Sequence, residues 1–342
     1  MTHAHKASAP VSLPPLPDHP LERLHDACTA AMTATNALIL ERLQSPVETI
    51  PEVAAYLINA GGKRIRPLLT LGCAALFGPA NDSAHKLAAA VEFIHSATLL
   101  HDDVVDGSDL RRGKPTANLT FGNKPAVLVG DFLFSRAFEL MVETNNLRVL
   151  ELLSRAASVI VEGEVMQLAT TGNLDLSMDD YLKTVSAKTA ALFAAAAAAG
   201  PALHGAPKAV QDALFTYGHH LGIAFQIADD VLDFIGTTSA FGKQPGNDFA
   251  EGKITAPILF ALHYAGETEK SFWRRTLVDH EIGAGDFDTA QHYLVQHDAF
   301  SKAHTLAETH QAQAVAALAS LPAHPIKEIL QDLAVYAARR EK

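Results

Sequence analysis

Apolar residues recur at three- and four-residue intervals along most of the chain, the spacing that places them on one face of an α-helix. The pattern predicts helices over residues 21–43, 53–60, 68–77, 83–106, 126–143, 147–168, 178–199 and 254–265, with further helices up to residue 338. We find no convincing series of strands, in which apolar and polar residues would alternate. The expected fold class is therefore all-α.

The first 20 residues do not share this pattern. They contain five prolines together with His, Ser and Ala, and such a segment buries too little apolar surface to offset the entropy lost on ordering. We therefore expect a disordered tail over residues 1–20, followed by one domain over residues 21–342. A large helical bundle can hold that many residues in a single domain.

Composition narrows the class of function. Hydrophobic residues make up 48% of the chain and the net charge is −11, which argues against general binding of nucleic acid because a phosphate backbone requires a basic face. Cys28 and Cys73 are too few for a disulfide framework, so reduced, buried thiols are expected. The sequence shows no apolar run of 18 residues without charges or breakers and no signal-peptide pattern. We therefore expect no transmembrane segment and a soluble, cytoplasmic protein.

Asp102, Asp103 and Asp106 lie within LLHDDVVDGSDLRRG, residues 99–113. On a helix, Asp102 and Asp106 share one face and Asp103 lies beside them. Like charges so close together, among apolar neighbours, are costly unless a cation lies between them. Oxygen ligands alone suit a hard ion such as Mg²⁺, which also binds substrate phosphates. A solvated acidic helix face is the alternative explanation for a single motif of this kind.

The same spacing occurs a second time, which favours the metal site. Asp229, Asp230 and Asp233 lie in GIAFQIADDVLDFIG, residues 222–236, within a segment that is apolar nearly all round. Such a helix is expected to be buried. Buried acids need partners, and two facing acidic clusters can share metal ions between them.

Basic segments accompany the two acidic motifs. GGKRIRP, residues 61–67, places three cations within four residues just before an apolar helix, where they can close around an anion. Lys188 and Thr189 interrupt an otherwise apolar helix. The segment 236–252 is rich in Gly, Thr and Lys and is a candidate lid or phosphate clamp. The alternatives are a solvated loop for the first segment and a lysine that reaches water for the second.

His95 precedes Asp102 by about two helical turns and lies on a similar face. A buried histidine with an ordinary structural role is the alternative to a binding role. The six alanines at residues 194–199 indicate close helix packing rather than chemistry.

Taken together and in this order, these motifs resemble the trans-isoprenyl diphosphate synthases, the polyprenyl synthetase family, over about residues 20–340. The resemblance implies an antiparallel helical bundle around a deep central cavity, assembled as a homodimer. It also implies a prenyltransferase that condenses isopentenyl diphosphate head-to-tail with an allylic diphosphate such as farnesyl diphosphate. The long-chain octaprenyl and decaprenyl diphosphate synthases are the most similar members.

The resemblance also implies roles for individual residues. Asp102, Asp106 and Asp229 would bind Mg²⁺, about two to three ions per site, with Asp103, Asp230 and Asp233 in support. Isopentenyl diphosphate would be held by Lys63, Arg66, His95 and Arg112. The allylic diphosphate would be held by Arg111, Lys188, Thr189, Gln226 and Lys243, with Lys253 as a further member. The residues expected to act directly in catalysis are Asp102, Asp106, Asp229, Arg111 and Lys188. Asn247 stands where the family commonly has aspartate. This puts in doubt its role as an acidic residue outside the direct metal ligands, and those ligands themselves are all present.

Product length is predicted from the helix that carries the first motif. A chain growing from Asp102 toward the N-terminus of that helix would pass Thr98, Ala97, Ile94 and Phe93 in turn. The first two are small, so the path stays open for at least one more turn of about 5.4 Å. We therefore expect a long all-trans product, about octaprenyl to decaprenyl, of the kind used for a quinone side chain.

Three alternatives remain at this stage. A shorter product, farnesyl or geranylgeranyl diphosphate, is the main one. A non-catalytic subunit of a heteromeric synthase is disfavoured because all six acids are present. A class I terpene cyclase is disfavoured because it has no use for a second diphosphate site, which Lys63, Arg66 and Arg112 would form.

Overall fold

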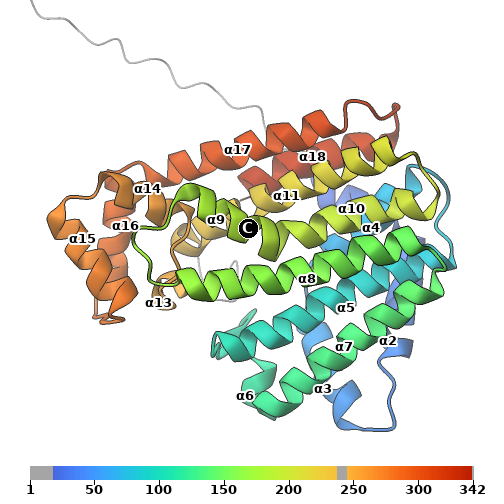
Figure 1. Ribbon diagram of the computed structural model, residues 1–342, viewed down its shortest axis with the longest axis horizontal. Coiled ribbons are helices and arrows are strands. Elements are labelled where there is room, and N and C mark those ends of the chain that lie inside the picture. The colour runs from blue at the N-terminus through green and yellow to red at the C-terminus, as the bar shows by residue number, and fades with distance from the viewer. Residues whose placement is uncertain (1–17, 237–244, 341–342) are drawn as a thin grey trace, which may run out of the picture.

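The computed structural model describes residues 18–236 and 245–340, and nearly all of its regular structure is helical (Figure 1). The first half of the described chain contains α1 (Pro20–Ala27), α2 (Thr29–Arg42), α3 (Thr49–Ile58), α4 (Ile65–Ala75), α5 (Asp82–Val105), α6 (Ala117–Phe121), α7 (Asn123–Glu143) and α8 (Leu147–Thr170). The second half contains α9 (Met178–Val185), the π-helical turn η1 (Ser186–Ala190), α10 (Ala191–Leu203), α11 (Lys208–Ile235), α13 (Asn247–Ala250), α14 (Ala256–Tyr264), α15 (Glu267–Trp273), a second π-helical turn η2 (Arg274–Val278), α16 (Asp286–Gln296), α17 (Ala299–Ala317) and α18 (Pro325–Arg339). The predicted all-α class is confirmed.

Some predicted boundaries were wrong. The single helix expected over residues 21–43 is two helices, because the backbone leaves helical geometry at Cys28 (φ −115°, ψ 11°). Pro20, assigned to the tail, is already the first residue of α1 and is buried. Residues 1–17 of the predicted tail lie outside the described part of the chain. The structure also contains a short β-hairpin, which the sequence did not predict. Its strands are β1 (Leu110–Arg111) and β2 (Lys114–Pro115), which pair antiparallel.

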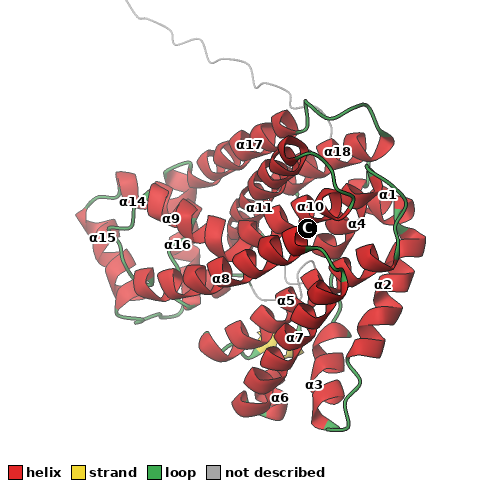
Figure 2. Cartoon of the chain, turned by 45° about the vertical axis from the view of Figure 1, so that its right-hand side comes forward, coloured by secondary structure: helices red, strands yellow, loops and turns green. Residues whose placement is uncertain are grey.

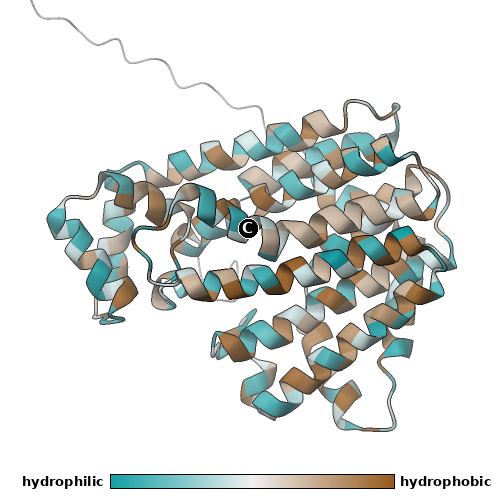
Figure 3. Ribbon diagram, viewed as in Figure 1, coloured by the Kyte–Doolittle hydropathy of each residue, from teal (hydrophilic) through white to brown (hydrophobic). Residues whose placement is uncertain are grey.

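Helix α10 runs through the middle of the bundle and packs against α4, α8 and α11 (Figure 1). All six alanines from Ala194 to Ala199 are buried, and the helix shows little hydrophilic colour along its length (Figure 3). Small side chains allow neighbouring helices to approach closely, so this alanine run is explained by packing, as predicted.

The other long helices are arranged around α10 in two groups. Helices α5 and α7 pack together on one side, and α11 is covered by α17 and α18 on the other (Figures 1 and 2). Helices α14, α15 and α16 form an extension at one end of the bundle (Figure 2). The two acidic motifs occupy the C-terminal ends of α5 and α11. Across the described residues, no helix combines the length and apolar character needed to cross a bilayer.

Candidate active site

The two acidic motifs border one cavity of about 720 Å³. Asp102 and Asp106 contribute to one part of its wall, and Asp229 and Asp233 to another. Basic side chains complete the lining; they are Lys63, Arg64, Arg66, Arg111, Arg112, Lys188, Lys253 and Arg340. Leu99, Ile160, Phe225 and Leu232 provide apolar surface. The predicted meeting of both motifs at a common pocket is therefore observed.

The middle aspartate of the first motif does not line this cavity. Asp103 is 1% exposed and accepts hydrogen bonds from Arg111, whose Nε and Nη2 lie 2.9 and 2.7 Å from Asp103 Oδ1. Arg111 is the last residue of β1, and the short segment between α5 and β1 places its side chain against the end of α5. The central residues of the β1–β2 turn, Arg112 (φ 53°) and Gly113 (φ 75°), both have the positive φ that tight hairpins favour.

Arg112 is packed closely against the basic loop before α4. A Cβ atom added to Gly62 would lie 2.7 Å from Arg112 Nη1, and the φ of 142° at Gly62 is one that residues with a side chain rarely adopt, so glycine suits this position. Arg64, like Arg112, has a positive φ of 46° although it is not glycine. Such backbone conformations are concentrated at functional sites, and both residues line the cavity.

Arg66 and His95 form a second part of the basic wall. Arg66 Nη1 lies 3.2 Å from His95 Nε2, which must accept the hydrogen bond because a guanidinium only donates. Burial, together with the charges of Arg66, Arg111 and Arg112, lowers the pKa of His95 well below its usual value. His95 is therefore neutral at pH 7. Burial lowers the pKa of Arg66 to about 10, which still leaves it charged.

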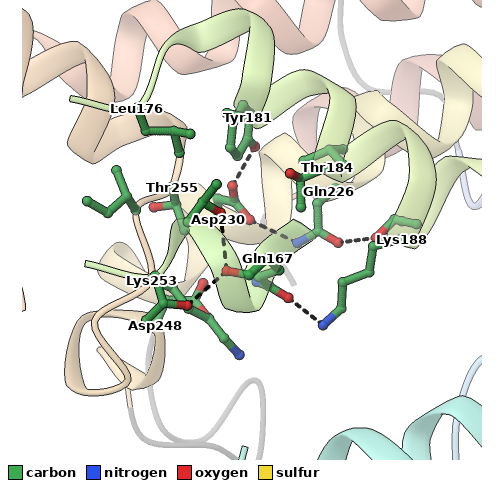
Figure 4. Close-up of a pocket in the computed structure, with 15 residues that line it drawn as sticks. Gln167, Leu176, Tyr181, Thr184, Lys188, Gln226, Asp230, Asp248, Lys253 and Thr255 are labelled. Atoms are coloured by element: carbon green, nitrogen blue, oxygen red, sulfur yellow. Dashed lines mark hydrogen bonds between the residues drawn. The ribbon is translucent and has the colours of Figure 1, made fainter. Parts of the chain in front are cut away.

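In the second motif the middle aspartate is again buried. Asp230 is 2% exposed, and Tyr181 donates to its Oδ2 at 2.5 Å. Gln226 donates to its Oδ1 at 2.9 Å, and the Gln226 oxygen accepts a hydrogen bond from Thr189 at 2.8 Å (Figure 4). Burial and the nearby Asp248 raise the pKa of Asp230 to about 7.

Lys188 and Thr189 lie in the π-helical turn η1 between α9 and α10. Such turns are rare and occur frequently at functional sites. Lys188 Nζ donates to Glu164 at 2.7 Å and to Gln167 at 2.6 Å, both on α8. The cation is thus held at the cavity wall, and it does not reach out to bulk water as the alternative interpretation required.

Two cations each pair with one outer aspartate, one in each motif. Lys253 Nζ lies 2.9 Å from Asp106 Oδ2, and Arg340 forms an ion pair with Asp229. Burial lowers the pKa of Lys253, but Asp248, Glu251 and Asp106 raise it by more, so its net pKa is above the ordinary value. Arg340 also stacks on Phe225, with Cζ 3.7 Å from the ring centre.

Asp102 shows why this wall suits a metal ion. Its carboxylate forms no hydrogen bond or ion pair within residues 18–236 and 245–340. Burial raises its pKa to about 7, with Glu164 and Asp106 adding to the rise and Lys188 and Arg111 opposing it. A partly buried carboxylate without a direct partner, facing a cavity with further carboxylates, is a donor that a hard cation would satisfy. In the described residues no three acidic, His or Cys side chains are yet close enough to hold an ion.

The predicted site residues therefore fall into three groups. Those at the cavity wall are Asp102, Asp106, Asp229, Asp233, Lys63, Arg66, His95, Arg111, Arg112, Lys188, Thr189, Gln226, Lys253 and Thr98. Those held behind the wall are Asp103 and Asp230, whose carboxylates orient other side chains. Phe93, Ile94 and Ala97 are fully buried, nearer the N-terminus of α5. Lys243 lies outside the described residues.

Sequence reasoning missed several residues at the site. Arg340 follows α18 and reaches the cavity from the far end of the chain, and the basic pair at residues 339–340 was its only signal. Glu92 faces the cavity from α5. Asp248 and Glu251 reach the cavity from the segment after α11. Tyr181 carries no sequence signal, because nothing distinguishes it from a core aromatic.

The chain is similar to known proteins over most of its length. The profile of the family described as Polyprenyl synthetase matches residues 47–294. The octaprenyl diphosphate synthase of Escherichia coli K12 is 40% identical over 322 residues, which cover 94% of this chain and 99% of that protein.

Solved structures are also similar over nearly their full length. A polyprenyl synthase from Caulobacter crescentus, complexed with calcium and isoprenyl diphosphate, has a TM-score of 0.91 and 50% identity, covering 94% of this chain and 98% of that one. A decaprenyl diphosphate synthase from Rhodobacter capsulatus has a TM-score of 0.89 and 48% identity, covering 94% and 99%.

Proposed function

Because this chain belongs to the polyprenyl synthetase family and is a prenyltransferase, we propose that it condenses isopentenyl diphosphate head-to-tail with an allylic diphosphate. The observation that carries this proposal is a single cavity lined by both acidic motifs and by two separate sets of cations. Two sets are needed because each of the two substrates carries a diphosphate.

The two sets of cations have different surroundings. Lys63, Arg66 and Arg112 lie with neutral His95 at the end of the cavity formed by the loop before α4, and we assign them to isopentenyl diphosphate. Arg111, Lys188 and Lys253 are each paired with a carboxylate of, or next to, the acidic motifs. We assign these, with Thr189 and Gln226, to the allylic diphosphate, whose leaving group develops negative charge.

Mg²⁺ is the proposed cofactor, held by Asp102 and Asp106 on one side and Asp229 on the other. When bound, it would stabilise the negative charge of the departing diphosphate. The chain's own residues hold the two substrates and exclude water from the reacting carbons, through Leu99, Ile160, Phe225 and Leu232. The double bond of isopentenyl diphosphate is the nucleophile, so no side chain has to form a covalent bond.

We further propose a long all-trans product, about octaprenyl to decaprenyl, that serves a quinone side chain. Relatives with octaprenyl and decaprenyl products in their names support this range. Thr98 lies at the cavity wall and Ala97 adjoins it on α5, so neither bulky nor aromatic side chains close the cavity at the first step toward the N-terminus of that helix.

A homodimer is the proposed assembly. Helix α8 exposes Val161, Val165 and Leu168, which are 54–60% exposed and spaced so that they share one face. Leu128 and Val142 on the adjacent α7 are also exposed. Val165→Glu is expected to give a monomer by light scattering, whereas the wild-type chain gives a dimer. A wild-type monomer at micromolar concentration would contradict this proposal.

The proposed reaction is tested by incubating the protein with isopentenyl diphosphate, farnesyl diphosphate and Mg²⁺, followed by chromatography of the dephosphorylated lipid. The expected result is a product of about eight to ten isoprene units. Asp102→Asn should abolish turnover, and Asp212→Asn should not, because Asp212 lies on α11 in an exposed pair with Lys208. A wild-type protein that forms no prenyl product would contradict the proposed function.

A further inference from the structure

Tyr181 is a buried tyrosine beside the active site to which the proposed reaction gives no role. It lies on α9 and is 5% exposed. Its hydroxyl points at Asp230 on α11, at 2.5 Å from Oδ2 (Figure 4). Tyr181 does not line the main cavity, so it does not contact a substrate held there.

Asp230 transmits this contact toward the cavity. Its other oxygen accepts a hydrogen bond from Gln226 Nε2, and this fixes which end of the Gln226 amide faces the carboxylate. A flipped amide would place two oxygens against each other. The Gln226 oxygen is therefore directed at Thr189, whose hydroxyl donates to it at 2.8 Å. Gln226 and Thr189 both line the main cavity.

Packing alone does not hold these side chains in place. A second, smaller cavity of about 140 Å³ adjoins them, and Tyr181, Thr189, Gln226 and Asp230 all contribute to its wall (Figure 4). Side chains in a close-packed core are fixed by their neighbours, but side chains beside a void have space to rotate. Hydrogen bonds must then select one arrangement.

The anchoring of Asp230 depends strongly on Tyr181. The carboxylate lies close to Asp248, and like charges repel. Gln226 and the backbone N–H of Ala256 are its other donors. Without the Tyr181 hydroxyl, a carboxylate oxygen that is shielded from solvent loses a hydrogen bond, and rotation of Asp230 would release the Gln226 amide as well.

We propose that Tyr181 is a positioning residue, which fixes Gln226 and Thr189 at the cavity wall through the hydrogen-bonded series Tyr181–Asp230–Gln226–Thr189. It acts on the substrate assigned to that wall, the allylic diphosphate, and in this respect the proposal rests on the proposed function. Among the described residues, no hydrogen bond or ion pair joins Arg66 or His95 to the series, so use of isopentenyl diphosphate is expected to be unaffected.

Kinetics of Tyr181→Phe test the proposal, because the variant keeps the ring and removes only the hydroxyl. We expect kcat/KM for the allylic diphosphate to fall about tenfold, equivalent to about 1.4 kcal/mol, while KM for isopentenyl diphosphate changes less than twofold. In a Thr189→Val background the same change should cause little further loss, since both variants break one series. Equal losses for both substrates, or additive losses in the double variant, would overturn the proposal.

Tyr217→Phe is the matched control. Tyr217 is fully buried on α11, and its hydroxyl donates to the backbone oxygen of Leu330 at 2.7 Å, away from the cavity. Its loss should lower thermal stability without changing either kinetic constant. If both tyrosine variants lose only stability, Tyr181 has a structural role alone and the proposal is wrong.

A crystal structure of Tyr181→Phe provides a readout that does not depend on the reaction. We expect the Gln226 amide to rotate toward the smaller cavity and the Thr189–Gln226 hydrogen bond to be lost. An unchanged series in that structure would contradict the proposal even if the wild-type protein proves active. A rotated Gln226 would support it even if the substrates are not those proposed.

Discussion

The acidic motifs of α5 and α11 place their three carboxylates in the same way relative to each helix. In both, the middle aspartate is buried and hydrogen bonded, while the first and last face the cavity. The middle aspartates differ in where their partners come from, whereas each motif has an outer aspartate that pairs with a distant cation. Asp103 pairs with Arg111, eight residues away. Asp230 is held by Tyr181, 49 residues away, and Asp229 pairs with Arg340 from the other end of the helical domain.

This difference teaches that one spacing can be stabilised in two ways. The middle aspartate of the first motif is supported by a local ion pair that the following hairpin supplies, and among the described residues only its last aspartate, Asp106, pairs with a distant cation, Lys253. The second is supported by neutral donors and by a distant cation, so it depends on the correct packing of α9 and α18 against α11. The outer aspartates should therefore be equivalent in function, and the middle ones should differ in their effect on stability.

The largest effect is expected at the outer aspartates. Asp102→Ala and Asp229→Ala should each lower kcat by roughly 10³-fold, because each removes a proposed ligand of the cation that would stabilise the departing charge. Steady-state assays with saturating Mg²⁺ and both substrates measure this. A loss at one motif and not at the other would show that the two are not equivalent.

The middle aspartates should separate the motifs by stability. Asp103→Ala leaves the Arg111 guanidinium without its ion-pair partner and should lower the free energy of unfolding by about 3 kcal/mol. Asp230→Ala leaves neutral donors and removes a carboxylate whose pKa burial has already raised, so about 1 kcal/mol is expected. Urea unfolding at pH 7.5 compares them. An equal or larger loss at Asp230 would contradict the distinction.

Product length should depend on the first motif's helix and not on the second's. Ala97→Phe is expected to shorten the product by several isoprene units while turnover continues, because a ring at this fully buried position would block extension along α5. Chromatography of the lipid from matched incubations with Ala224→Phe, on the equivalent turn before Asp229, provides the comparison. An unchanged product from Ala97→Phe would show that the chain does not extend along α5.

The smallest expected effect is on the pH dependence of the free energy of unfolding. It concerns a histidine pair of which one member lies on α11, the helix of the second motif. The Nδ1 atoms of His220 on α11 and His310 on α17 lie 3.0 Å apart. Burial, with the nearby His220 and His219, lowers the pKa of His310 to about 4. Below about pH 6.5 the unfolded chain therefore binds more protons than the folded chain. The contribution of this pair to the free energy of unfolding is complete above that pH and is lost as the pH falls toward 4.

His310→Gln should reduce that decrease, measured as the difference in urea midpoint between pH 7.5 and pH 5. His85→Gln is the control, since His85 is only half-buried near the start of α5 and lies outside this pair. The same pH dependence in wild type and His310→Gln would contradict the assignment to this pair.

The same contrast explains how much could be predicted from sequence. The helical class and the facing acidic motifs follow from spacing and local charge, so they were predictable. Asp103 and Arg111 lie close together in the sequence, but their pairing depends on a hairpin. The strands of that hairpin have only two residues each, which is too short to be recognised in the sequence. Tyr181 and Arg340 could not be found, because their roles arise from packing between helices far apart in the sequence.

The product range remains a prediction for a related physical reason. Thr98 is at the cavity wall, but Ile94 and Phe93 are fully buried, so the path for a long chain is not open along α5 in this structure. Small residues can show where a tunnel is able to form, whereas its length depends on how the surrounding helices separate.

The central claim is that the two acidic motifs hold their cation jointly. Titration calorimetry of Mn²⁺ in the presence of inorganic diphosphate tests it with Asp102→Asn, Asp229→Asn and the double variant. A shared site predicts that the double variant loses little more affinity than the weaker single variant, with a coupling free energy of at least about 1 kcal/mol. Strictly additive losses would mean two independent sites and would contradict the account.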